Sequence, residues 1–90
     1  MSIAAVITKI MPDAPSADLK EIESKALPIL EKEGAKNISF SEEKVAFGLT
    51  ALMAKFAWPE EKDTSIIEDG LAKIEHVSSA QITDYRRAFG

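Results

Sequence analysis

The sequence predicts an α+β fold in which a four-stranded antiparallel sheet carries two helices on one of its faces. Four stretches rich in alternating or β-branched residues are separated by two stretches whose apolar residues recur every three or four positions, in the order β-α-β-β-α-β. Because crossovers between parallel strands are right-handed, this order places the first and third strands at the centre of the sheet. The predicted architecture is the split βαβ, or ferredoxin-like, sandwich.

The first strand is predicted over Ile3–Met11 and ends at the segment Pro12–Pro15, which a strand or helix interior tolerates poorly. Ser16 is the expected N-cap of the first helix. Pro28 lacks an amide proton and should kink or loosen the final turns of this helix, which Gly34 then ends. The apolar stripe of the helix consists of Leu19, Ile22, Ala26, Ile29 and Leu30.

The middle of the chain predicts a hairpin. Lys36–Ser41 alternates as a short strand, Glu42–Lys44 is the expected turn, and Val45–Trp58 is the longer returning strand. On this assignment Phe47 lies near the start of the third strand.

The second helix and the last strand complete the pattern. Pro59–Lys62 breaks the third strand, and Ser65 and Glu68 have the spacing of a capping box. The fourth strand is predicted over Val77–Arg86. The possible helix caps are Asp63, Thr64 and Ser65, and the apolar stripe of this helix is Ile67, Leu71 and Ile74.

Length and composition indicate one cytoplasmic domain spanning residues 1–90. A chain of 90 residues with 46% hydrophobic content can bury one two-layer core. It has no cysteine, which excludes disulfides and thiolate metal sites, and its longest early apolar run, Ile3–Ile7, is too short for a signal peptide or a membrane span.

Charge and residue types disfavour several classes of function. Fifteen acidic and eleven basic residues give a net charge of −4, which disfavours nucleic acid or an anionic membrane as a partner and favours a protein. The single histidine, His76, has no visible partner for metal binding or general-base catalysis, and the four glycines are isolated. We therefore expect no enzyme activity, no metal site and no cofactor.

Two segments instead indicate contact points. Phe47 stands beside Gly48, which removes cover from one side of the aromatic ring, and Arg86 and Arg87 lie in the closing segment Gln81–Gly90 of an otherwise acidic chain. The third and fourth strands run parallel in the predicted topology. The start of the third strand and the end of the fourth should therefore lie at opposite ends of the sheet, with Phe47 far from Arg87.

Three segments resemble one family over essentially the whole chain. Val45–Leu52 reads Val-Ala-Phe-Gly-Leu-Thr-Ala-Leu, Ile74–Ser78 reads Ile-Glu-His-Val-Ser, and Asp84–Arg87 reads Asp-Tyr-Arg-Arg. Together they are similar to archaeal elongation factor 1-beta. The resemblance implies a guanine nucleotide exchange factor that promotes GDP release from elongation factor 1-alpha during translation elongation, acts without covalent chemistry and is a monomer when free.

The resemblance also implies which residues bind the partner. Arg87, with Arg86 and Tyr85 beside it, matches the end of the fourth strand that enters between the switch regions of the GTPase, where a basic side chain disturbs the magnesium and phosphate-loop site. Phe47, with Ala46 and Gly48 shaping the tip, matches the phenylalanine that docks on the second domain of the GTPase. Eukaryotic relatives have a lysine where this chain has Arg87, and the two side chains hydrogen-bond differently.

Two other functions are compatible with the predicted topology. A regulatory module of this fold would dimerise and bind a metabolite in a pocket. An RNA-binding module would need aromatic residues on the open face of its central strands and a basic surround, and the first strand has no aromatic residue.

Overall fold

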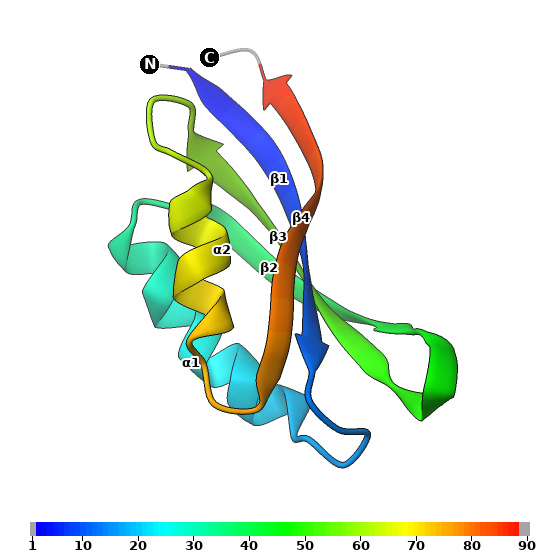
Figure 1. Ribbon diagram of the computed structural model, residues 1–90. Coiled ribbons are helices and arrows are strands. Elements are labelled where there is room, and N and C mark those ends of the chain that lie inside the picture. The colour runs from blue at the N-terminus through cyan, green and yellow to red at the C-terminus, as the bar shows by residue number, and fades with distance from the viewer. Residues whose placement is uncertain (1, 89–90) are drawn as a thin grey trace.

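The computed structural model, which describes residues 2–88, has the predicted order of elements. The strands form one antiparallel sheet in the order β2-β3-β1-β4, and both helices cover the same face of it (Figure 1). The predicted fold class and the central positions of the first and third strands are confirmed. Phe89 and Gly90 of the closing segment lie outside the described residues. The elements are β1 (Ile3–Pro12), α1 (Leu19–Lys32), β2 (Lys36–Lys44), β3 (Thr50–Pro59), α2 (Ser65–Ala72) and β4 (Val77–Ala88).

The hydrophobic core lies between the sheet and the two helices. Alternate residues of β1 are buried because successive strand side chains point to opposite faces. Phe56 and Trp58 of β3 both belong to the core and pack edge to face with their ring centroids 6.2 Å apart. The buried residues from the two predicted helical stripes are Ile22, Ala26, Leu30, Ile67, Leu71 and Ile74.

The first helix begins later than the sequence predicts. Its N-cap is Asp18 rather than Ser16, and the Asp18 carboxylate accepts a hydrogen bond of 3.0 Å from the Lys20 amide. The helix continues through Pro28 to Lys32, and Gly34 follows it with a φ of 97°, in the left-handed region that glycine adopts at helix ends.

The predicted hairpin is confirmed, but its turn lies elsewhere. Glu42–Lys44, the predicted turn, continues β2, because main-chain pairing with β3 extends to Lys44 opposite Thr50. The connection is instead Val45–Leu49, with one turn of 3-10 helix at Ala46–Gly48. The predicted strand over Val45–Trp58 therefore starts five residues late, at Thr50, and Phe47 belongs to the turn.

Capping of α2 also differs from the predicted capping box. Asp63 Oδ1 accepts a hydrogen bond of 2.9 Å from the Ser65 amide. This bond lowers the pKa of the Asp63 carboxyl, and a hydrogen bond from the Ser65 side chain lowers it further by a smaller amount. Glu68 does not turn back to the helix start. Its Oε2 accepts a hydrogen bond of 3.0 Å from the Ile82 amide of β4, so it covers part of an exposed sheet edge.

One core position should be improved by substitution. Thr8 is fully buried on the helix-facing side of β1, and its Oγ1 has no hydrogen-bond partner among the described residues. We expect Thr8→Val, which keeps the β-branched shape and removes the unpaired hydroxyl, to raise the free energy of unfolding by about 1 kcal/mol, measured by denaturant titration. Thr83→Val is the matched control, because the Thr83 hydroxyl donates to the Ile7 carbonyl at 3.3 Å. A less stable Thr8→Val protein would show that the hydroxyl is satisfied.

Candidate partner-binding site

Phe47 projects from the tip of the β2–β3 hairpin. Its side chain is 94% exposed. The turn is closed by two main-chain hydrogen bonds, from the Val45 amide to the Leu49 carbonyl at 2.9 Å and from the Leu49 amide to the Ala46 carbonyl at 3.2 Å. Burial of a phenylalanine ring normally contributes about 1.5–3 kcal/mol. Because the Phe47 ring is exposed, this free energy is still available for binding to another surface.

The backbone of this turn is strained at the aromatic residue. Phe47 has φ 62° and ψ 31°, in the left-handed region that bulky residues seldom adopt. Gly48 follows with φ 74°, and a side chain added there would meet no atom within 4 Å. Gly48 thus fits the turn geometry and leaves open space beside the ring, while Ala46 is also exposed. Strain of this kind is often retained where a residue contacts a ligand or partner.

The two arginines leave β4 on opposite faces of the sheet. Arg86 is opposite Ala5 and lies on the open face, where its Nε is 3.1 Å from Asp84 Oδ2. Arg87 is opposite Ala4 and lies on the side that carries the helices, where its Nε is 2.9 Å from Glu60 Oε1. The adjacent arginines are therefore paired with different carboxylates.

The predicted separation of the two tips, Phe47 on the β2–β3 hairpin and Arg87 at the end of β4, is confirmed. Ile3, at the start of β1, pairs with Pro59 at the end of β3 and with Ala88 at the end of β4. The start of β3 and the end of β4 consequently lie at opposite ends of the sheet, in a molecule whose longest dimension is 41 Å (Figure 1). Phe47 and Arg87 are too far apart to contact one spot on a partner. A partner that binds both would have to extend along the sheet from one end to the other.

Tyr85 lies on the same side of β4 as Arg87. It is opposite Val6, is 40% exposed and lines an open depression of about 360 Å³. The other lining residues are Thr64, Glu68 and Ile82. The sequence groups Tyr85 with both arginines, whereas the structure places it with Arg87 on one face and leaves Arg86 on the other.

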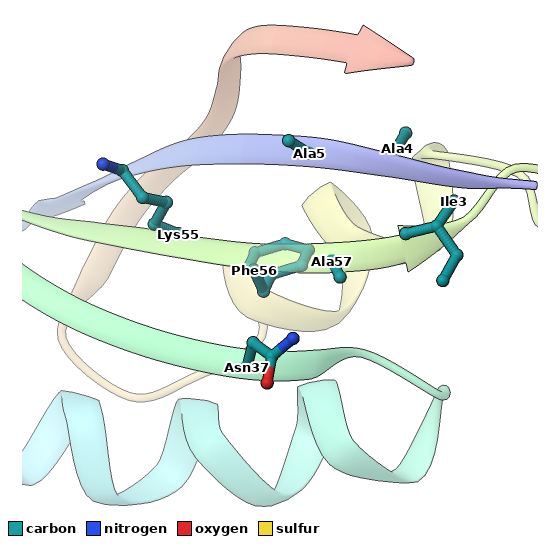
Figure 2. Close-up of a pocket in the computed structure, with 7 residues that line it drawn as sticks. All are labelled: Ile3, Ala4, Ala5, Asn37, Lys55, Phe56 and Ala57. Carbon is teal, nitrogen blue, oxygen red and sulfur yellow. The ribbon is translucent and has the colours of Figure 1, made fainter. Parts of the chain in front are cut away.

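The open face of the sheet bears directly on the RNA-binding alternative. Figure 2 shows a mainly apolar hollow of about 180 Å³ on this face, which is flanked by β1, β2 and β3. An irregularity in β2 pairing between Lys36 and Ser39, together with a φ of 55° at Asn37, lies beside this hollow. The aromatic residues of β3, Phe56 and Trp58, are buried in the core, so the central strands present no aromatic stacking surface within residues 2–88. The lining residues are Ile3, Ala4, Ala5, Asn37, Lys55, Phe56 and Ala57.

His76 is more constrained than its sequence context predicts. Its φ is 72°, its Nδ1 is 3.4 Å from Asp13 Oδ2, and its Nε2 is 3.2 Å from Glu75 Oε1. The Asp13 amide also donates to the His76 carbonyl at 2.8 Å, which ties the α2–β4 turn to the end of β1. In the described part of the chain no group of three or more histidine, cysteine or acidic residues could hold a metal ion.

Glu60 is the partner of Arg87 that sequence reasoning missed. It is 27 residues away along the chain and lies within an acidic run that also includes Glu61 and Asp63, and the run by itself is typical of a solvated turn. The only signal in the sequence is indirect: the predicted topology brings the end of the third strand beside the end of the fourth.

The structure defines a small ferredoxin-like protein in which Phe47 and Arg87 are exposed at opposite ends of one sheet. No helix within residues 2–88 is long and apolar enough to cross a membrane. The family model described as the EF-1 guanine nucleotide exchange domain matches residues 5–87. The chain belongs to the elongation factor 1-beta family, which confirms the resemblance found in its sequence.

Relatives named elongation factor 1-beta match almost the full length of the chain. The protein of Halobacterium salinarum is 35% identical over 91 residues, covering 97% of this chain and 99% of the relative. The protein of Methanosphaera stadtmanae is 32% identical and covers 97% of this chain and 98% of the relative. The protein of Methanobrevibacter smithii is 38% identical over 80 residues, which cover 88% of this chain and 89% of the relative.

Proposed function

We propose that residues 1–90 form one exchange domain that promotes GDP release from elongation factor 1-alpha during translation elongation. The family supports an exchange role, and the placement of an exposed cation and an exposed aromatic ring at opposite ends of one sheet supports contact with two parts of a GTPase. The protein works in the cytoplasm, as a monomer when free, and makes or breaks no covalent bond. Its partner-binding residues are Ala46, Phe47, Gly48, Tyr85, Arg86 and Arg87.

The placement of Arg87 carries the proposal. GDP is held in a GTPase largely by concentrated charge, from the magnesium ion and from the loop around the phosphates. A guanidinium brought to that site competes with the metal for the same negative groups, and its 84% exposure leaves it accessible for this contact. A thousandfold acceleration of release would require lowering the barrier by only about 4 kcal/mol.

Phe47 supplies binding at a distance from the nucleotide. Its ring docks on a second surface of the GTPase and holds the factor in place while Arg87 acts. Binding of the exchange factor and binding of GDP to the GTPase are thermodynamically linked. The exchange factor must therefore weaken GDP binding to the same extent as GDP weakens binding of the exchange factor. Nucleotide that refills the site then releases the factor, which allows repeated use.

Stopped-flow release of a fluorescent GDP from the cognate elongation factor 1-alpha tests the proposal. At fixed magnesium concentration we expect the release rate to rise with factor concentration and then saturate. Removal of magnesium with EDTA gives the reference rate for a site without the metal, and a folded variant carrying both Phe47→Ala and Arg87→Ala is the negative control. If folded parent protein left the release rate unchanged at every concentration, the proposed function would be wrong.

A further inference from the structure

Glu60 places a carboxylate against the arginine at the end of β4. It follows the last residue of β3, and its Oε1 is 2.9 Å from Arg87 Nε. The two side chains differ sharply in exposure, because Glu60 is only 16% exposed and Arg87 is 84% exposed. A largely buried anion therefore braces a largely exposed cation.

The atoms that meet leave the working end of the guanidinium free. The closest pair of atoms is Arg87 Nε and Glu60 Oε1, and the two terminal nitrogens, which carry four of the five N–H groups of an arginine side chain, take no part in that pair. The brace thus restrains the base of the Arg87 guanidinium while its terminal nitrogens stay available to a partner. A contact through the terminal nitrogens would have occupied the same groups that bind phosphate or carboxylate.

The turn that carries Glu60 is anchored on three sides. The Glu60 amide donates to the Ser2 carbonyl at 3.1 Å, and the Trp58 indole donates to the Lys62 carbonyl at 3.3 Å. Lys62 Nζ in turn lies 3.0 Å from Glu33 Oε1 at the end of α1 and 5.7 Å from the centre of the Trp58 ring. These contacts tie the turn to the residue before β1, to the core and to the C-cap of α1, so Glu60 lies on an anchored turn.

No other described group replaces Arg87 as the partner of this carboxylate. Glu60 Oε1 is buried from solvent and has no aligned hydrogen-bond donor among the described residues, so its contact with Arg87 is an ion pair. Arg86 cannot substitute, since it lies on the open face and pairs with Asp84. The pairing is therefore specific to one of two adjacent arginines.

We infer that Glu60 is a positioning residue that holds the exposed Arg87 guanidinium in place before the GTPase binds. The inference rests on the proposed function. An unrestrained arginine samples many rotamers, and fixing it at the moment of nucleotide release costs entropy that Glu60 removes in advance. Glu60 should consequently affect the rate of release within the bound complex more than the affinity of the complex.

The test is GDP release with Glu60→Gln, which keeps the side-chain size and removes the charge. We expect the maximal release rate at saturating factor to fall by about two- to fivefold, as for loss of one ion pair with an exposed arginine, and the half-saturating concentration to change by less than about twofold. Glu61→Gln removes the same charge from the exposed neighbouring residue and should leave both parameters unchanged. Glu60→Asp retains the charge at shorter reach and should fall between the parent and Glu60→Gln.

A double-mutant cycle separates positioning from a general effect on the fold. In an Arg87→Ala background, Glu60→Gln should no longer change the maximal rate, because the side chain that it positions is gone. Nuclear magnetic resonance relaxation of the Arg87 Nε–Hε group in the free factor gives a readout without the GTPase. Glu60→Gln should increase the mobility of this group, and Glu61→Gln should not.

The outcomes distinguish failure of the positioning role of Glu60 from failure of the proposed exchange function. If the parent protein accelerates release and Glu60→Gln is as fast or faster, the positioning role is wrong while the proposed function stands. An equal loss in the parent and Arg87→Ala backgrounds, or an unchanged mobility of the Arg87 Nε–Hε group, would also overturn it. If the parent itself leaves release unchanged, the proposed function and this inference are both wrong.

Discussion

Arg87→Ala is expected to lower the maximal rate of GDP release by about ten- to hundredfold, because a hydrogen bond to a charged group contributes roughly 1.5–3 kcal/mol. The half-saturating concentration should change by less than about threefold, since the guanidinium acts on the nucleotide site after the factor has bound. Stopped-flow release over a range of factor concentrations measures both quantities.

Three further variants make this result specific. Lys20→Ala removes the same charge from an exposed residue in the first turn of α1 and should behave as the parent. Arg86→Ala should cause a smaller loss than Arg87→Ala, because Arg86 lies on the opposite face of β4. Arg87→Lys tests whether charge alone is sufficient. Thermal unfolding of each variant is needed as well, because Arg87→Ala leaves the Glu60 carboxylate without its partner. A full rate with Arg87→Ala would remove the assigned role.

Phe47→Asn is expected to raise the half-saturating concentration of the factor by about ten- to hundredfold, because an aromatic ring that becomes buried on binding contributes roughly 1.5–3 kcal/mol. The maximal rate should stay within about twofold of the parent, since the hairpin tip lies at the opposite end of the sheet from Arg87. The same titration of release rate against factor concentration provides the measurement.

The choice of asparagine separates the ring from the turn. Asparagine adopts the left-handed conformation more readily than phenylalanine, so Phe47→Asn removes the ring and keeps the backbone that has φ 62°. Leu27→Ala is the matched control for loss of an exposed apolar side chain, because Leu27 is 37% exposed on α1. An unchanged half-saturating concentration in Phe47→Asn would mean that the ring does not contact the GTPase.

The two variants together test the division of labour between the tips. One should change mainly the rate within the complex and the other mainly the affinity, because they act on different parts of the partner. If both changed the same parameter by the same factor, the two ends of the sheet would not have the separate roles proposed for them.

Local pattern in the sequence was sufficient for the architecture. Alternation over Ile3–Met11 predicted β1, and the stripes of three- and four-residue spacing predicted both helices, because those periods match the strand and the helix. Once the order of elements was known, the handedness of crossovers left one arrangement of the four strands. That arrangement also predicted the separation of Phe47 from Arg87.

Local pattern in the sequence was insufficient where main-chain pairing or a residue distant in sequence decides the local structure. Glu42–Lys44 is polar enough for a turn, yet it continues β2, because an edge strand pairs through its backbone and accepts charged side chains. Glu68 has capping-box spacing, yet it binds the Ile82 amide, which only the packing of α2 against β4 brings within reach.

The sequence by itself determined the fold class and the order of the strands, and it indicated Phe47 and Arg87 as candidate contact residues, since these inferences depend on periodicity, chain order and residue type. Only the tertiary structure decided how the tips are presented. It places Phe47 in a left-handed turn rather than in a strand, and it separates Arg86 from Arg87 by the face of β4 on which each lies. It also brings Glu60 to Arg87 across 27 residues of chain, a contact that depends on the packed ends of two strands and leaves no periodic signal in the sequence.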